Sequence, residues 1–201
     1  MTESNLVAQR LEEYQYSDAF MVSDFTDIAD YENAKKILLR MEQNGQIRRI
    51  FRGVYDKPQF SAFLNEYVAP NPDNVAKALA RNFKWEIVPT GNTALNYLGL
   101  STQVPARIEY VSTGPSRKYS YDKTTLSFTH SSSRLTEGLS YKSALVVQAL
   151  KALGKDYVDE KTIATLRSRL SEVEKKTLYE EAKHTTAWIY SAVKRICREE
   201  Q

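Results

Sequence analysis

Hydrophobic positions between Tyr31 and Glu42 recur at helical spacing, with apolar residues at Ala34, Ile37, Leu38 and Met41. This spacing lines one face of a helix and leaves a polar face opposite. Asp30 stands where an N-cap belongs, and Gly45 where a helix ends. After Gly45 the period changes to two, because apolar positions alternate with arginines up to Val54, and Gly53 permits a tight reversal. The pattern predicts a helix followed by a two-stranded hairpin.

Two further helices are expected before this stretch. Ser4 is a candidate cap for a helix to Tyr14, and a short second helix is expected to start at Ser23. Three helices followed by a hairpin within residues 1–58 predict a winged helix-turn-helix domain. The predicted fold class is mostly α with α+β character, and the alternative for 31–57 is a solvated helix beside a basic hairpin.

Charge is strongly segregated along the chain, although the formal net charge is only +3. Residues 31–57 hold seven basic and three acidic residues, whereas residues 1–30 hold one basic and seven acidic residues. Such segregation favours a nucleic-acid partner. We expect base contacts from Asn33, Lys36 and Arg40. Phosphate or minor-groove contacts are expected from Lys35, Arg48, Arg49 and Arg52.

A connector is expected at 59–73, where Pro70 and Pro72 are taken to close off helix formation. A second domain is expected at 74–201, with a helix at 75–83, a short strand at 85–88 and a short helix at 93–98. Two strands, 108–112 and 125–129, are expected to form a hairpin or to be neighbours in a small sheet.

Three interpretations are open for the connecting segment 113–123. Its glycine, hydroxyls and cations are the ingredients of a phosphate site, but the spacing fits neither a P-loop nor a dinucleotide fingerprint. Arg117 and Lys118 are candidates for a second contact with the DNA backbone. A solvated turn is the third interpretation.

The last sixty residues predict helices at 141–153, after Asp159, and from a Ser171–Glu174 capping box to the end of the chain. An apolar stripe from Leu178 to Ile196 belongs to a core or to a partner surface. In the second case Trp188 and Tyr190 are the candidate partner-binding residues.

Other classes of protein find little support in the sequence. Hydrophobic residues make up 42% of the chain, without an apolar run long enough to span a membrane. The N-terminus lacks the apolar core of a signal peptide, so we expect a cytoplasmic protein. Cys197 is the single cysteine, and neither His130 nor His184 has a partner at metal-ligand spacing. We expect no enzyme activity, no metal and no cofactor.

Two segments of the chain resemble AbiEi-type antitoxins, in particular a DUF6088-like branch. They are DFTDIADYENAKKILLRMEQNGQIRRIFRGVYDKP and IVPTGNTALNYLGLSTQVPARIEYVSTGPSRKY. The matching hairpin residues are Arg48, Arg49, Arg52, Gly53 and Tyr55. The resemblance implies an antitoxin of an abortive-infection system that binds repeated half-sites in its own promoter and counteracts a nucleotidyltransferase-like toxin. The alternatives are a transcriptional regulator without a toxin and an interaction module with a vestigial wing.

Overall fold

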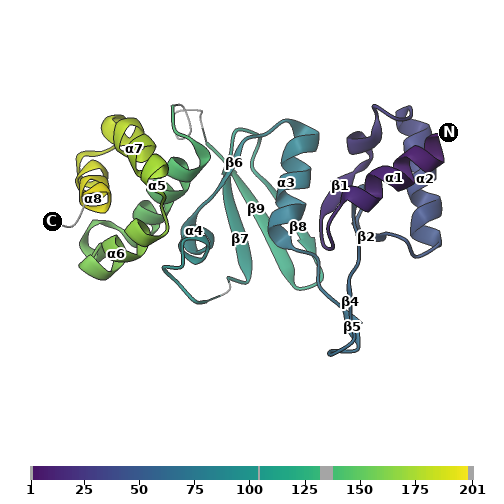
Figure 1. The fold of residues 1–201 in the computed structure, drawn as a ribbon, viewed down its shortest axis with the longest axis horizontal. Helices are drawn as coiled ribbons and strands as arrows, with labels where there is room; N and C mark the ends of the chain where they lie inside the picture. Colours follow the sequence, from purple (N-terminus) through teal and green to yellow (C-terminus); the bar gives the residue numbers. More distant parts are fainter. Residues whose placement is uncertain (1, 104, 132–137, 199–201) are drawn as a thin grey trace. The chain divides into compact units, whose positions relative to one another are not determined.

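A computed structural model describes residues 2–103, 105–131 and 138–198. The chain forms two compact units, residues 1–85 and 86–201. Both helices and small sheets are present, so the fold is of mixed α+β type (Figure 1). The boundary lies later than the expected start of a second domain at residue 74, because the helix after the connector packs within the first unit.

The first unit alternates helices with short strands. Its elements are α1 (Glu3–Glu13), β1 (Ala19–Met21), the 3-10 helix η1 (Val22–Phe25), α2 (Tyr31–Gln43), β2 (Arg48–Phe51), β3 (Val54–Asp56), β4 (Phe60–Ser61), β5 (Glu66–Tyr67) and α3 (Pro72–Phe83). An antiparallel sheet has the strand order β1-β3-β2. The core under α1 and α2 is filled by apolar side chains that include Val7, Phe20, Phe25, Ile37 and Leu38.

Helix α2 agrees with the sequence prediction. The Asp30 carboxylate accepts the Asn33 N–H at 3.1 Å, and the four predicted apolar positions are buried. Two details of the preceding region differ from expectation. Thr2, not Ser4, caps α1, and the expected helix at Ser23 is only a 3-10 turn that starts at Val22.

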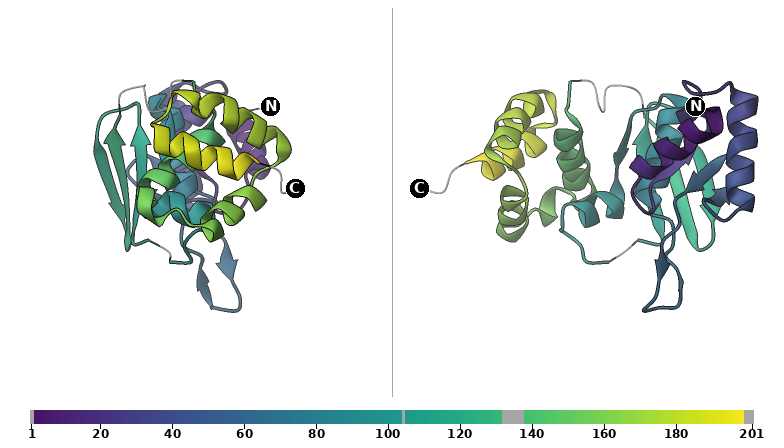
Figure 2. Two further views of the ribbon diagram at one scale, coloured as in Figure 1. Left: turned by 90° about the vertical axis from the view of Figure 1, so that its left-hand side faces the viewer. Right: turned by 45° about the vertical axis from the view of Figure 1, so that its right-hand side comes forward.

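The connector contains structure that was not predicted. Strands β4 and β5 form a small hairpin that projects from the rest of the first unit (Figures 1 and 2). Phe60 and Tyr67 pack edge to face across it, while Phe63 at its turn is 95% exposed. Pro72 does not block a helix, because it occupies the first turn of α3, where a missing N–H costs nothing. The side chain of Asn71 caps that helix.

The second unit combines a four-stranded sheet with helices. Its elements are β6 (Ile87–Pro89), α4 (Gly91–Tyr97), β7 (Arg107–Ser112), β8 (Arg117–Tyr121), β9 (Thr124–His130), α5 (Tyr141–Leu153), η3 (Lys155–Tyr157), α6 (Glu160–Ser168), α7 (Glu172–Glu181), η4 (Ala182–His184) and α8 (Ala187–Cys197). The strand order is β6-β7-β9-β8. Helices α4 and α5 contact strands β7 and β6, and α6, α7 and α8 form a helical layer with α5 (Figure 1).

The two strands expected around the 113–123 segment are parallel neighbours, so they do not form a hairpin. The segment itself supplies β8, which pairs antiparallel with β9. The expected single final helix is interrupted at residues 182–186, which divides it into α7 and α8. Its apolar stripe is a core feature, since Leu178, Ile189 and Ile196 are buried in the helical layer.

Candidate nucleic-acid interface

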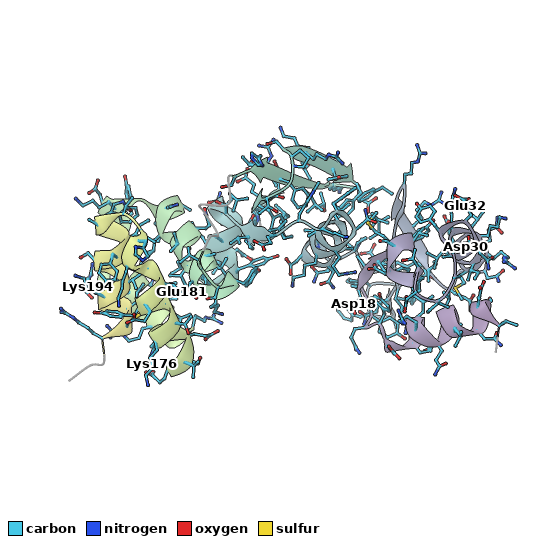
Figure 3. All side chains as sticks on the ribbon, turned by 90° about the horizontal axis from the view of Figure 1, so that it is seen from above. Asp18, Asp30, Glu32, Lys176, Glu181 and Lys194 are labelled. Carbon is cyan, nitrogen blue, oxygen red and sulfur yellow. The ribbon has the colours of Figure 1, made fainter. Side chains whose placement is uncertain are left out.

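The exposed side of α2 lies opposite its buried face. Residues on two adjacent rows of the helix surface are exposed: Tyr31, Lys35, Leu39 and Gln43 on one row, and Glu32, Lys36 and Arg40 on the other. Figure 3 marks Asp30 and Glu32 at the start of this helix. We refer to these seven residues as the α2 surface. It combines three cations with one glutamate, a leucine, a tyrosine and a glutamine.

The cations of the α2 surface have few internal partners. Lys35 Nζ lies 3.4 Å from the Glu32 carboxylate, and both side chains are more than half exposed. Such an exposed pair contributes little and is easily exchanged for another anion. The Arg40 Nε donates to the backbone oxygen of Lys36 at 3.3 Å, which holds the guanidinium along its own helix.

Asn33 does not belong to this surface. It is half-buried, and its side-chain amide donates to the Glu3 carboxylate of α1. The reason is its place on the helix, because Asn33 precedes the buried Ile37 by four residues and so lies on the row that faces the core. The geometry therefore argues against the predicted base contact by Asn33.

Arg48 is part of the internal structure of the first unit. Its Nε lies 2.9 Å from the carboxylate of Asp56, which is fully buried, and a second guanidinium nitrogen contacts the other carboxylate oxygen. A third nitrogen donates to the Val68 carbonyl at 3.1 Å. The buried carboxylate requires this cation as its partner. Arg48 is thus poorly placed for the predicted phosphate contact, and it connects the sheet to the chain that follows β5.

Arg49 has partners within the first unit but is still partly exposed. Its guanidinium donates to the Tyr55 hydroxyl at 3.2 Å, lies 5.5 Å from the centre of that ring and pairs with Glu42 at 3.3 Å. The hydrogen bond to Tyr55 raises the pKa of Arg49. Because much of the side chain is still exposed, a phosphate contact is compatible with this geometry.

Arg52 occupies the tip of the β2–β3 hairpin. The turn consists of Arg52 and Gly53, and Gly53 has a φ of +85°, which favours glycine. Arg52 is exposed, and no carboxylate among the described residues lies within 4 Å of it. It is the hairpin arginine best available to an external anion.

Two acidic residues that precede α2, Asp24 and Asp27, have partners within the first unit. Asp24 accepts the Met21 N–H at 2.9 Å and pairs with Arg81 of α3 at 3.1 Å. Asp27 pairs with Arg10 at 2.8 Å, and this hydrogen bond lowers the pKa of Asp27. Arg81 and Arg10 therefore partly neutralise the charge of these two carboxylates. This weakens the repulsion of a polyanion near α2.

Arg117 and Lys118 lie at the start of the edge strand β8 in the second unit, and both are exposed. As adjacent strand residues they point to opposite faces, so they do not form one cationic patch. The preceding loop is closed by its own hydrogen bonds. The Gly114 N–H donates to Ser112 Oγ at 3.0 Å, and Ser116 Oγ accepts the His130 N–H at 2.8 Å. These groups are therefore not free to cradle a phosphate, as one interpretation of the segment requires.

Trp188 and Tyr190 are half-buried against the core of the helical layer. The Tyr190 ring lies 5.9 Å from that of Tyr179, and Lys194 Nζ lies 4.9 Å from its centre. A hydrogen bond to Tyr179 raises the pKa of Tyr190. Both predicted partner-binding residues thus have packing roles, with part of each ring left accessible.

Sequence reasoning missed four residues of the α2 surface: Tyr31, Glu32, Leu39 and Gln43. Their exposure could have been predicted, because the helical spacing that buries Ala34, Ile37, Leu38 and Met41 places these residues on the opposite side of the helix.

In the described residues, no group of three metal-ligating side chains comes together. The described helices also include none with the length and apolar character needed to cross a membrane.

Comparisons with known proteins place the chain in a family without assigning it an activity. No curated protein matches the sequence. Among solved structures, the chain is similar to the Rv2827c protein of Mycobacterium tuberculosis, with 14% identity and a TM-score of 0.45, over 96% of this chain and 75% of the other. The model of DUF6088, a family of unknown function, matches residues 6–178. The chain therefore belongs to the DUF6088 family.

Proposed function

We propose that residues 1–58 form a winged helix that binds double-stranded DNA, with α2 in the major groove and Arg52 on the adjacent backbone or in the minor groove. The order of α1, β1, η1, α2, β2 and β3, with an antiparallel β1-β3-β2 sheet, supports this assignment. The observation that carries the proposal is the α2 surface, where Lys36 and Arg40 are exposed and have no carboxylate partner among the described residues.

The length of α2 is compatible with binding in the major groove. With 13 residues, α2 is about 20 Å long, which is enough to cross a major groove. The proposed target is the protein's own promoter. Lys35 and Arg49 would add backbone contacts once their weak pairs with Glu32 and Glu42 open. The predicted repeated half-sites are part of this proposal.

The first test is binding of the full chain to its own upstream DNA at two salt concentrations, with an unrelated duplex for comparison. A Lys36→Ala/Arg40→Ala/Arg52→Ala variant should lose specific binding and lower the salt slope by about three, because each phosphate contact contributes about one. A Lys155→Ala/Lys161→Ala/Lys176→Ala variant has the same change in charge at exposed positions of the second unit and should bind normally. Equal, weak binding of both duplexes by all three proteins would refute the proposal.

We further propose that the protein is the antitoxin of an abortive-infection pair and that the second unit carries the neutralising activity. Support comes from the resemblance of the two segments to AbiEi-type antitoxins, one in each unit. Trp188 and Tyr190, whose rings are partly accessible, are the proposed contacts if neutralisation requires direct binding.

The antitoxin role is tested by expressing the neighbouring gene with and without this protein. Cells should grow only when the protein is present, and the Lys36→Ala/Arg40→Ala/Arg52→Ala variant should still protect them, because neutralisation is assigned to the other unit. If the neighbouring gene is harmless on its own, the protein is better described as a regulator without a toxin.

A further inference from the structure

Leu39 is a large apolar side chain on the exposed side of α2. It lies at the centre of the α2 surface and is 41% exposed, although the core beneath α2 is already filled by Ala34, Ile37, Leu38 and Met41. Leu39 is not among the side chains that form the described core of the first unit. Single exposed leucines are common, so the neighbours of Leu39 decide what it means.

Those neighbours form an ordered row. Tyr31, Lys35, Leu39 and Gln43 follow one another at intervals of four, and all four are exposed. Arg40 and Lys36 lie on the adjacent row and provide the positive charge. An apolar side chain and an amide therefore share one face of the helix, with cations beside them.

The base pairs of DNA differ in what they offer to such a face. In the major groove, thymine presents a C5-methyl group, which favours apolar contact. Adenine presents N6 and N7, which a glutamine amide binds with two hydrogen bonds. Guanine is read mainly by arginine or lysine. A leucine and a glutamine one turn apart therefore match the two bases of A·T pairs.

We propose that α2 reads A·T pairs, with Leu39 against a thymine methyl group and Gln43 on an adenine. This inference rests on the proposed DNA binding and assigns the chemistry of the bases that the protein selects. Lys35, Lys36 and Arg40 then act mainly on the flanking phosphates, which position the helix but carry little sequence information.

The contact to thymine is tested by replacing each thymine of the bound duplex with uracil, which removes only the methyl group. At one or two positions the full chain should bind about fourfold more weakly, which is the factor expected for one methyl-sized group. Leu39→Ala should lose about the same factor on the thymine duplex and should not distinguish thymine from uracil. Leu39→Met, which keeps the apolar bulk, should retain the discrimination.

The contact to adenine is tested in the same way with 7-deazaadenine, which lacks the N7 acceptor. The full chain should lose about tenfold in affinity at one adenine, and Gln43→Ala should be insensitive to that change. Gln43→Glu serves as a second variant, because it has the same shape but lacks the amide donor, and it should be at least as impaired as Gln43→Ala.

The outcomes separate this inference from the proposed function. Specific binding to promoter DNA with no sensitivity to uracil at any position would leave DNA binding intact and overturn the role of Leu39. A Leu39→Ala variant that still binds the thymine duplex about fourfold more tightly than the uracil duplex would also overturn that role, because the leucine and the methyl group would then act independently. Absence of all specific DNA binding overturns both. Thermal melting of each variant shows whether the fold is retained.

Discussion

The α2 surface and the surface of α7 and α8 are built from similar side chains, yet their cations are in different situations. Between α7 and α8, Lys183 of η4 pairs with Glu180 and lies 5.9 Å from the Tyr179 ring, while Lys194 of α8 lies over Tyr190. Figure 3 marks Lys194 on α8. On α2, Lys36 and Arg40 have no carboxylate within 4 Å among the residues that the structure describes.

The comparison shows that the charge of a segment and the charge it offers to a ligand are different quantities. Of the seven basic residues in 31–57, Arg48 is bound to buried Asp56, and Lys57 donates to the carbonyls of Leu11 and Tyr14 at 3.2 Å. Cations with such partners must break them before they bind phosphate. Variants that remove an engaged or an available cation test this distinction.

The largest effect is expected where an engaged arginine is removed. Arg48→Ala leaves the buried Asp56 carboxylate without its partner and should reduce the free energy of unfolding by about 3 kcal/mol. Arg52→Ala removes an exposed tip residue and should change it by less than about 0.5 kcal/mol. Urea denaturation of the two variants provides the measurement. Equal stabilities would show that the Arg48–Asp56 pair is not structural.

A smaller effect is expected from cations on the two helical surfaces. Lys36→Ala/Arg40→Ala should lower the salt slope of DNA binding by about two. Lys183→Ala/Lys194→Ala removes the same charge from η4 and α8 and should leave the slope unchanged. The measurement is the affinity for promoter DNA at several salt concentrations. A similar decrease in both variants would mean that DNA contacts extend to the second unit.

The smallest effect concerns acid stability at the start of α7. The Ser171 N–H donates to Glu174 Oε2 at 2.8 Å, and this bond lowers the pKa of Glu174 below its ordinary 4.5. A lowered pKa stabilises the fold above pH 4.5, and the contribution disappears as the pH falls through the folded-state value. Glu174→Gln should therefore have a slightly lower melting temperature than the unmodified protein at pH 7, and the two melting temperatures should be equal at acid pH. The difference stays below about 1 kcal/mol, because the site is exposed.

Local signals in the sequence predicted the helices well. Helix α2, the caps at Asp30 and Asp159, and the Ser171–Glu174 capping box depend on residues close in the chain, and all are present in the structure. Short elements were missed because few residues specify them. Strand β1 has three residues, and each strand of the β4–β5 hairpin has two.

The candidate site was only partly predictable from the sequence. Helical periodicity identifies the α2 cations, but it cannot reveal that Arg48 binds Asp56 and Val68, since the latter lies 20 residues away. The side-chain contact of Asn33 with Glu3 spans 30 residues and is equally hidden. Partners distant in the chain therefore decide which cations are available to bind an external anion, and these partners are known only from the folded structure.

The β4–β5 hairpin also makes the chain vulnerable to proteases. Phe63 and Leu64 are exposed at its turn, and both are residues after which chymotrypsin cleaves, so we expect the first cut there. Arg81 of α3 would still pair with Asp24 and donate to the Ala19 carbonyl on the far side of the cut. The nicked protein should therefore remain assembled under native conditions and separate into two fragments only in denaturant.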